Sequence, residues 1–256
     1  MRYEVLGPVR LVDGADRSAI SARKIETVLT VLLIRSDQVV PLDQLITEIW
    51  DEAPPRRAMA GLHVYISQVR KFLDRPGRTG SPVVTRAPGY LLRKGDDEID
   101  FHQFRAAVDR GRRLMRERRH EEAAACLEAA LGLWRGPVLG DQRGGPIIEG
   151  FVTWMTESRL ECLEILAEAY LRLGRHREVI GRLYSLVTEN PLREVYYRQL
   201  MLALYRSERQ ADALEVYRSA RQTLRDELGL EPCRALRDLQ RAILTADERL
   251  DLRAAS

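Results

Sequence analysis

Residues 56–73 read RRAMAGLHVYISQVRKFL. Leu62, Ile66 and Val69 recur at helical spacing and mark one apolar face, which Phe72 and Leu73 extend. The opposite face carries side chains that form hydrogen bonds, two of them fixed cations: His63, Ser67, Arg70 and Lys71. The stretch predicts an amphipathic helix whose outer face suits a polar, charged partner.

Downstream of this helix, two short runs of strand-forming residues, 83–86 and 90–93, flank Ala87-Pro88-Gly89. Proline followed by glycine suits the two central positions of a type II turn, so we expect a β-hairpin here. The hairpin would carry three cations, Arg86, Arg93 and Lys94.

Upstream, the sequence supplies the rest of a small domain. Asp13-Gly14 indicates a tight turn between strands, and Pro54-Pro55 ends a helix because proline cannot continue the hydrogen-bond ladder. The patterns predict strands over residues 3–6, 9–12 and 17–20, then helices over 25–33 and 41–50. Two helices, a basic third helix and a basic hairpin predict an α+β winged helix-turn-helix domain over residues 1–95.

The charge in this first domain is unevenly distributed. Residues 56–94 hold nine Lys or Arg and one acid, whereas residues 37–55 hold five acids and no Lys or Arg. A basic helix fits the major groove of duplex DNA, and cations on the helix and hairpin contact phosphates. The candidate DNA-binding residues are Arg56, Arg57, His63, Ser67, Arg70, Lys71, Arg86, Arg93 and Lys94. The alternative is that 56–73 is an ordinary surface helix.

Residues 96–256 predict an all-α second domain. The run 175–180 is similar to the run 209–214, a period of 34 residues, and 119–124 is similar to 175–180 with an insertion that fits the Gly/Pro-rich break at 135–150. Such periodicity predicts tetratricopeptide-like packing of helix pairs. Repeats of this kind offer a surface for interaction or self-association, or else only complete a scaffold.

Several function classes are disfavoured. The chain has no apolar run long enough to span a membrane and no signal-peptide pattern at its start, so we expect a cytoplasmic protein. The phosphate-loop, HExxH and GxSxG motifs are absent, and three separated cysteines show no metal-binding spacing. We therefore expect no enzyme activity, cofactor or metal.

Two segments together resemble a known family: IWDEAPP at 49–55 and TRAPGYLL at 85–92. They are similar to the SARP regulators, the Streptomyces antibiotic regulatory proteins, and the resemblance runs from about residue 1 to about residue 248. It implies an OmpR-like winged helix joined to a bacterial transcriptional activation domain. Members activate gene clusters for secondary metabolites, bind direct repeats overlapping the −35 region and recruit RNA polymerase. Departures from the family pattern at Ala60, Gly61, His63 and Gln68 affect the expected base preference, and Gly61 suggests close backbone approach to DNA.

The resemblance also gives the acidic stretch a role. By it, Asp51, Glu52 and Glu48 would contact the polymerase sigma factor; the alternative is a solvated acidic loop. On tandem sites two copies would meet head to tail, so self-association at the nucleoid is expected. Two rival functions stay open: a protein–protein adaptor built on the repeats, and a repressor that uses the same DNA-binding domain.

Overall fold

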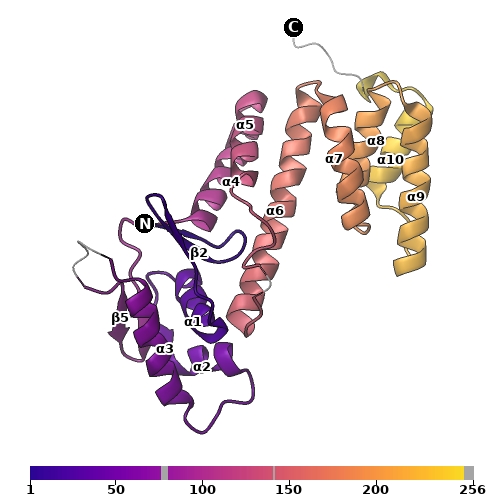
Figure 1. The fold of residues 1–256 in the computed structure, drawn as a ribbon. Helices are drawn as coiled ribbons and strands as arrows, with labels where there is room; N and C mark the ends of the chain where they lie inside the picture. Colours follow the sequence, from indigo (N-terminus) through magenta and orange to yellow (C-terminus); the bar gives the residue numbers. More distant parts are fainter. Residues whose placement is uncertain (76–79, 141, 251–256) are drawn as a thin grey trace. The chain divides into compact units, whose positions relative to one another are not determined.

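The computed structural model of the chain describes residues 1–75, 80–140 and 142–250 (Figure 1). Strands and helices are mixed as far as Ile99, and helices follow. The mixed part comprises β1 (Arg2–Glu4), β2 (Arg10–Asp13), β3 (Asp16–Ser18), α1 (Arg23–Ile34), β4 (Val40–Pro41), α2 (Leu42–Trp50), α3 (Ala58–Phe72), β5 (Val83–Arg86), β6 (Gly89–Leu92) and β7 (Glu98–Ile99). This is the OmpR-like winged helix that the sequence predicts.

Two small sheets frame the three helices of this part. The first has the order β3-β2-β1-β7, with β1 antiparallel to β2 and parallel to β7. Its β2–β3 hairpin turns at Gly14, whose φ of 60° is the left-handed conformation expected of Asp-Gly. The second sheet has the order β4-β6-β5 and is antiparallel throughout.

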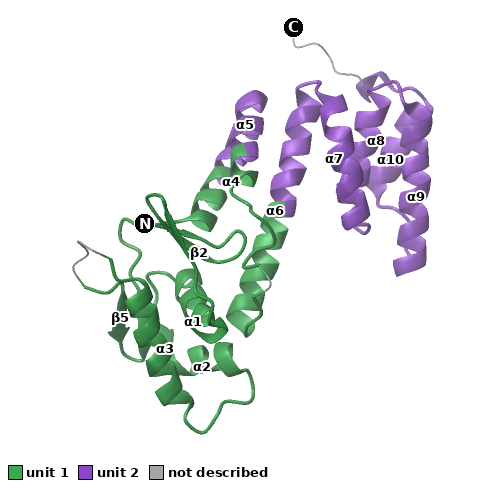
Figure 2. Cartoon of the chain, in the orientation of Figure 1, with its two compact units in different colours: residues 1–107, 129–159 green, residues 108–128, 160–256 purple. Residues whose placement is uncertain are grey.

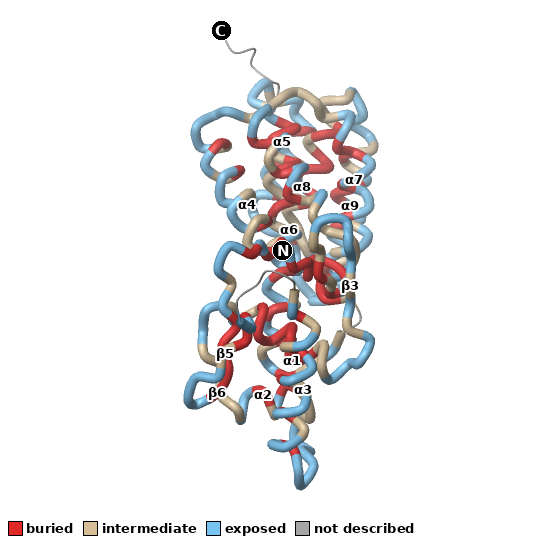
Figure 3. The backbone as a smooth tube through the Cα atoms, turned by 60° about the vertical axis from the view of Figure 1, so that its left-hand side comes forward, coloured by how far each residue is buried: buried red, intermediate tan, exposed pale blue. Residues whose placement is uncertain are grey.

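Burial follows the apolar pattern of the sequence. In α1 the residues from Thr27 to Leu33 are all buried, and all four residues of β6 are buried as well (red in Figure 3). Leu62, Ile66 and Val69 of α3 are at most 1% exposed. The hydrophobic core therefore fixes α3 from its inner side and holds its outer side toward solvent.

The helical part begins at Asp100. It comprises α4 (Asp100–Arg116), α5 (His120–Leu131), α6 (Pro146–Arg172), α7 (His176–Glu189), α8 (Glu194–Tyr205), α9 (Gln210–Leu228), α10 (Arg234–Leu244) and a 3-10 turn at Glu248–Leu250.

One type of turn recurs before α5, α7 and α9. A residue with positive φ (Arg118, Gly174 or Glu208) is followed by an arginine whose amide donates to a carbonyl five residues back, at 2.9 to 3.0 Å. The same arginine pairs with an acid three residues on, in the pairs Arg119–Glu122, Arg175–Glu178 and Arg209–Asp212. These are the three segments that the sequence repeat aligns.

The compact units do not follow the predicted division at residue 95. Unit 1 comprises residues 1–107 and 129–159, and unit 2 comprises residues 108–128 and those from 160 onward (Figure 2). Within unit 1, the amide of Arg135 donates to the Leu6 carbonyl at 2.8 Å, and that of Leu139 donates to the Val5 carbonyl at 2.9 Å. The segment 129–159 is thus built into the same unit as the winged helix.

Candidate nucleic-acid interface

Helix α3 has a buried face and an exposed face. Ala58, Leu62, Ile66 and Val69 are buried against the rest of unit 1. Seven exposed residues form what we call the outer face of α3: Met59, Ala60, His63, Val64, Ser67, Gln68 and Lys71. The predicted residues His63, Ser67 and Lys71 thus lie on one surface.

The wing is the β5–β6 hairpin, which is held against β4. Its pairs run from Val83 opposite Leu92 to Arg86 opposite Gly89. The predicted type II turn is wrong: the Ala87–Pro88 peptide bond is cis, and Gly89 lies in β6 without a positive φ. Glycine is needed there for another reason, because a Cβ at Gly89 would lie 1.8 Å from the Val40 carbonyl oxygen.

Arg70 joins α3 to the wing. Its Nε donates to the Val83 carbonyl at 3.0 Å, and its Nη2 donates to Thr85 Oγ1 at 2.9 Å. Its guanidinium also lies 5.7 Å from the ring centre of Tyr90. These contacts engage Arg70 within the protein, so it acts as a positioning residue that sets the wing relative to α3.

The remaining predicted cations differ in whether they have partners within the protein. Lys94 is held internally, because its Nζ donates to the carbonyls of Gly95 and Asp97 at 3.1 and 2.9 Å. Five others are exposed and have no carboxylate partner within the described part of the chain: Arg56, Arg57, Lys71, Arg86 and Arg93. Exposed cations without acidic partners on a helix and its wing suit a polyanion such as the DNA backbone.

Val64 and Met59 are apolar residues of the outer face that the sequence reading did not select. Val64 is 52% exposed and Met59 is 42% exposed. The signal for Val64 was present, because it lies two residues from both Leu62 and Ile66 and so falls off their apolar stripe. Any partner of α3 would meet these apolar groups as well as polar ones.

Gly61 packs against Trp50. A Cβ at Gly61 would lie 3.4 Å from two carbon atoms of the Trp50 ring. The same ring lies 5.8 Å from the Tyr65 ring and 5.1 Å from Lys24 Nζ. At 3.4 Å that Cβ would be in ordinary van der Waals contact with the ring, so packing against Trp50 does not require glycine at this position, and the close approach of its backbone to DNA stays a prediction.

The acidic residues predicted to meet polymerase divide into two groups. Asp51 and Glu52 follow α2 and are exposed. Glu48 is only 5% exposed, and its carboxylate accepts hydrogen bonds from the amides of Ile147, at 2.6 Å, and Ile148, at 3.3 Å. Burial raises its pKa, although these bonds oppose the shift. Glu48 caps the first turn of α6 and is removed from the expected polymerase contact.

Comparison with known proteins assigns both parts of the chain. Residues 19–92 match the family described as transcriptional regulatory protein, C terminal, and residues 99–244 match the bacterial transcriptional activator domain. The regulatory protein DnrI of Streptomyces peucetius is 35% identical over 257 residues, which cover 98% of this chain and 94% of DnrI. The chain belongs to the SARP family of transcriptional regulators.

Two other relatives match nearly the whole of this chain. The transcriptional regulatory protein MoaR1 of Mycobacterium tuberculosis is 37% identical over 95% of this chain and 79% of its own length. A solved structure of Mycobacterium tuberculosis EmbR, in complex with a low-affinity phosphopeptide, matches with a TM-score of 0.90 and 36% identity. That match covers 96% of this chain and 65% of the EmbR chain.

Membership of the SARP family defines the broad role of the chain. It is a transcriptional regulator and not an enzyme, since both matched families and the relatives are regulators. No helix among the described residues is long and apolar enough to cross a membrane.

Proposed function

We propose that this SARP-family chain binds duplex promoter DNA, with the outer face of α3 in the major groove and the wing on flanking phosphates. One observation carries the proposal: five exposed cations, which have no acidic partner among the described residues, lie along α3 and the wing, and the inner side of α3 is fixed by the core. An α-helix fits the major groove, where base edges present a unique pattern of donors and acceptors.

The exposed pair Asp51 and Glu52 supports activation in preference to repression. These acids precede the cations of α3 directly and would face away from a polyanion, toward a second protein. We assign them to the sigma factor of RNA polymerase. The chain would act at the nucleoid, on direct repeats near a −35 element of a secondary-metabolite gene cluster, with two copies meeting head to tail.

DNA binding is tested by fluorescence anisotropy with labelled promoter DNA of the neighbouring genes. If about six phosphates are neutralised, log affinity should fall against log salt with a slope of about −5. Lys71→Ala and Arg86→Ala should each weaken binding and reduce that slope by about 1. Arg172→Ala is the matched control, because Arg172 pairs with Glu168 on α6 in unit 2. Binding that ignores salt would exclude the proposed interface.

Activation is tested by in vitro transcription with the double variant Asp51→Asn, Glu52→Gln. We expect unchanged DNA affinity and reduced transcript, with Asp43→Asn, an exposed acid of α2, as the control. Transcript reduced by the wild-type chain itself would show a repressor. Loss of both DNA affinity and transcript in the double variant would show misfolding, and unchanged transcript would exclude the polymerase contact.

A further inference from the structure

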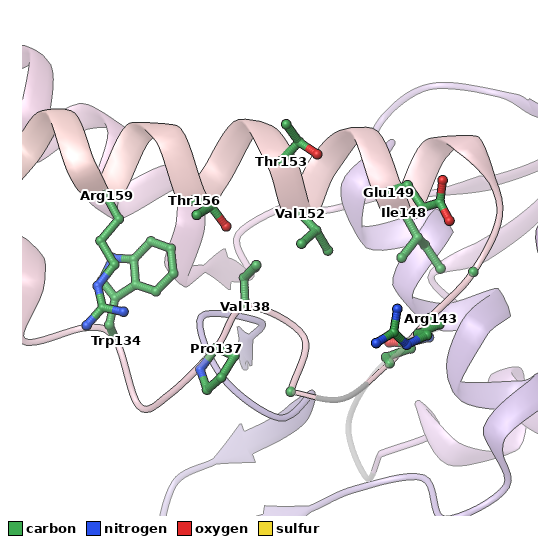
Figure 4. A pocket seen from close by; sticks show the side chains of 13 residues that line it. Trp134, Pro137, Val138, Arg143, Ile148, Glu149, Val152, Thr153, Thr156 and Arg159 are labelled. Atoms are coloured by element: carbon green, nitrogen blue, oxygen red, sulfur yellow. The ribbon is translucent and has the colours of Figure 1, made fainter. Parts of the chain in front are cut away.

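A cavity of about 650 Å³ lies between residues of 134–140 and 142–144 on one side and the first half of α6 on the other, within unit 1 (Figure 4). Val138 and Val152 contribute apolar walls in its middle, and Ile148 contributes another near Arg143. Arg159, beside Trp134, and Arg143 lie toward its two ends. A concavity of this size that combines apolar walls with polar groups is typical of sites for small molecules.

Trp134 is held rigidly at one end of the cavity. The guanidinium of Arg159 lies 4.9 Å from its ring centre, and the Phe104 ring meets it edge-on with centres 5.3 Å apart. The indole Nε1 is buried and has no hydrogen-bond acceptor among the described residues. An aromatic wall fixed in this way costs little conformational entropy when a ligand binds.

The charges of the cavity favour an anion. Arg143 and Arg159 line it, and neither has a carboxylate partner in the described part of the chain. Glu149 is the one acid among the described lining residues. Guanidinium groups beside apolar walls suit a carboxylate or sulfonate attached to an apolar body, because the planar fork binds two oxygens at once.

The walls of the cavity also hold the helices of the winged domain. Gln142 accepts a hydrogen bond from Thr30 Oγ1 at 2.8 Å and donates to Thr27 Oγ1 at 3.4 Å, both in α1. The amide of Ile148, another wall residue, donates to the Glu48 carboxylate of α2 at 3.3 Å. A ligand that shifts these walls would change the support of α1 and α2.

We propose that this cavity binds a small organic acid with an apolar body, and that its occupancy changes the affinity of the chain for DNA. The site lies in the Gly/Pro-rich break of the sequence, which had no chemical signature of its own. Binding at this site is independent of DNA binding, whereas the change in DNA affinity rests on the proposed function.

The test uses two probes with the same skeleton, 8-anilinonaphthalene-1-sulfonate and the neutral N-phenyl-1-naphthylamine, titrated into the full-length chain by calorimetry. The sulfonate should bind saturably with one site per chain and at least tenfold more tightly than the neutral probe. Arg143→Ala and Arg159→Ala should each weaken binding of the sulfonate at least fivefold, and Arg143→Ala should leave binding of the neutral probe unchanged. Val152→Trp should weaken both probes by filling the cavity.

Arg172→Ala provides the matched control, since Arg172 lies on α6 outside the cavity lining. Equal binding of the two probes, or sulfonate binding unaffected by all three cavity variants, would overturn the site. Circular dichroism of each variant separates loss of the site from loss of the fold.

DNA affinity measured with and without saturating sulfonate tests the second half of the proposal. A change of at least threefold in the wild type, absent in Arg159→Ala, is expected. Saturable binding without any change in DNA affinity would overturn the coupling, whereas salt-dependent DNA binding without the probe would still report on the proposed function alone.

Discussion

Val64 is the residue on the outer face of α3 with the clearest consequence for sequence preference. It is 52% exposed, in a surface whose other members are mostly polar or small. In the major groove, an apolar side chain of this size distinguishes thymine by its C5-methyl group. If α3 lies in that groove, Val64 should favour thymine at one position of each half-site.

Replacing thymine by deoxyuridine removes that methyl group and nothing else. We expect one such replacement per half-site to weaken binding by about 1 kcal/mol, or roughly fivefold. The Val64→Ala variant should bind the thymine-containing DNA more weakly by a similar factor. It should bind the thymine-containing and the deoxyuridine-containing DNA equally. Anisotropy titrations of the four combinations form a double-mutant cycle. If the effects of Val64→Ala and of the deoxyuridine replacement are additive at every thymine, Val64 contacts no methyl group. That result would not contradict DNA binding itself.

Arg70 and Lys71 are neighbouring cations with different expected roles. Arg70 is bonded to Val83 and Thr85 of the wing, whereas Lys71 is exposed and has no carboxylate partner among the described residues. Arg70→Ala should therefore lower the free energy of unfolding by about 1–2 kcal/mol and also weaken DNA binding. Lys71→Ala should weaken DNA binding alone.

Urea unfolding and anisotropy on the same preparations measure these two effects. Arg70→Lys is a further test, because lysine lacks the planar fork that reaches two acceptors. The Arg70→Lys variant should therefore be about as unstable as Arg70→Ala. An Arg70→Ala variant with wild-type stability would contradict the role of Arg70 in positioning the wing.

At the scale of elements, local patterns in the sequence predict most of the winged helix. The face of α3 follows from the spacing of Leu62, Ile66 and Val69, and the turn at Gly14 follows from Asp-Gly, because both depend on neighbours in the chain. The recurring turns before α5, α7 and α9 are equally local, since each lies within nine consecutive residues.

The features that the sequence does not predict depend on distant partners. Gly89 faces the Val40 carbonyl, Arg70 reaches the wing, and Glu48 caps a helix that begins 98 residues later, at Pro146. Composition and periodicity describe a residue's own segment and carry no information about such pairings. Among the cations of 56–94, those that are exposed and those that bond within the protein therefore cannot be distinguished in the sequence. Only the fold separates them.

The cap formed by Glu48 gives a prediction about stability. Glu48→Ala should lower the free energy of unfolding by about 2 kcal/mol, because two amides of the first turn of α6 lose a buried acceptor. Glu48→Gln keeps one acceptor oxygen and should cost less than the alanine variant. Urea unfolding at pH 7 measures both, and equal stability of all three chains would contradict the cap.

The pH dependence of that cap has a definite sign. Burial raises the pKa of Glu48 above its ordinary value of 4.5, so the folded chain binds the proton more tightly than the unfolded chain does. The contribution of Glu48 to stability should thus rise as pH falls from 7 toward 5. The difference in unfolding free energy between wild type and Glu48→Gln should increase in favour of wild type over that range. A difference that shrinks would mean that the ionised form is the one preferred in the fold.

At the scale of the whole molecule, the two compact units interleave along the chain. Unit 1 takes residues 129–159 in addition to 1–107, so the unit that contains the winged helix is not a contiguous segment. The backbone carbonyls of Val5 and Leu6 have their partners in Leu139 and Arg135, and both Val5 and Leu6 are fully buried. The first strand region of the winged helix is therefore bonded to the segment that precedes α6.

This arrangement predicts that a fragment ending at residue 107 is unstable relative to one ending at residue 159. The shorter fragment loses the amide donors of Arg135 and Leu139, the partners of Glu48, and the apolar cover that Val138 and Leu139 provide. Its free energy of unfolding should be lower by at least about 3 kcal/mol, and its DNA affinity should fall with it. Urea unfolding and anisotropy on the two fragments measure this directly. Equal stability would mean that residues 1–107 fold on their own and that the segment 129–159 only rests against them.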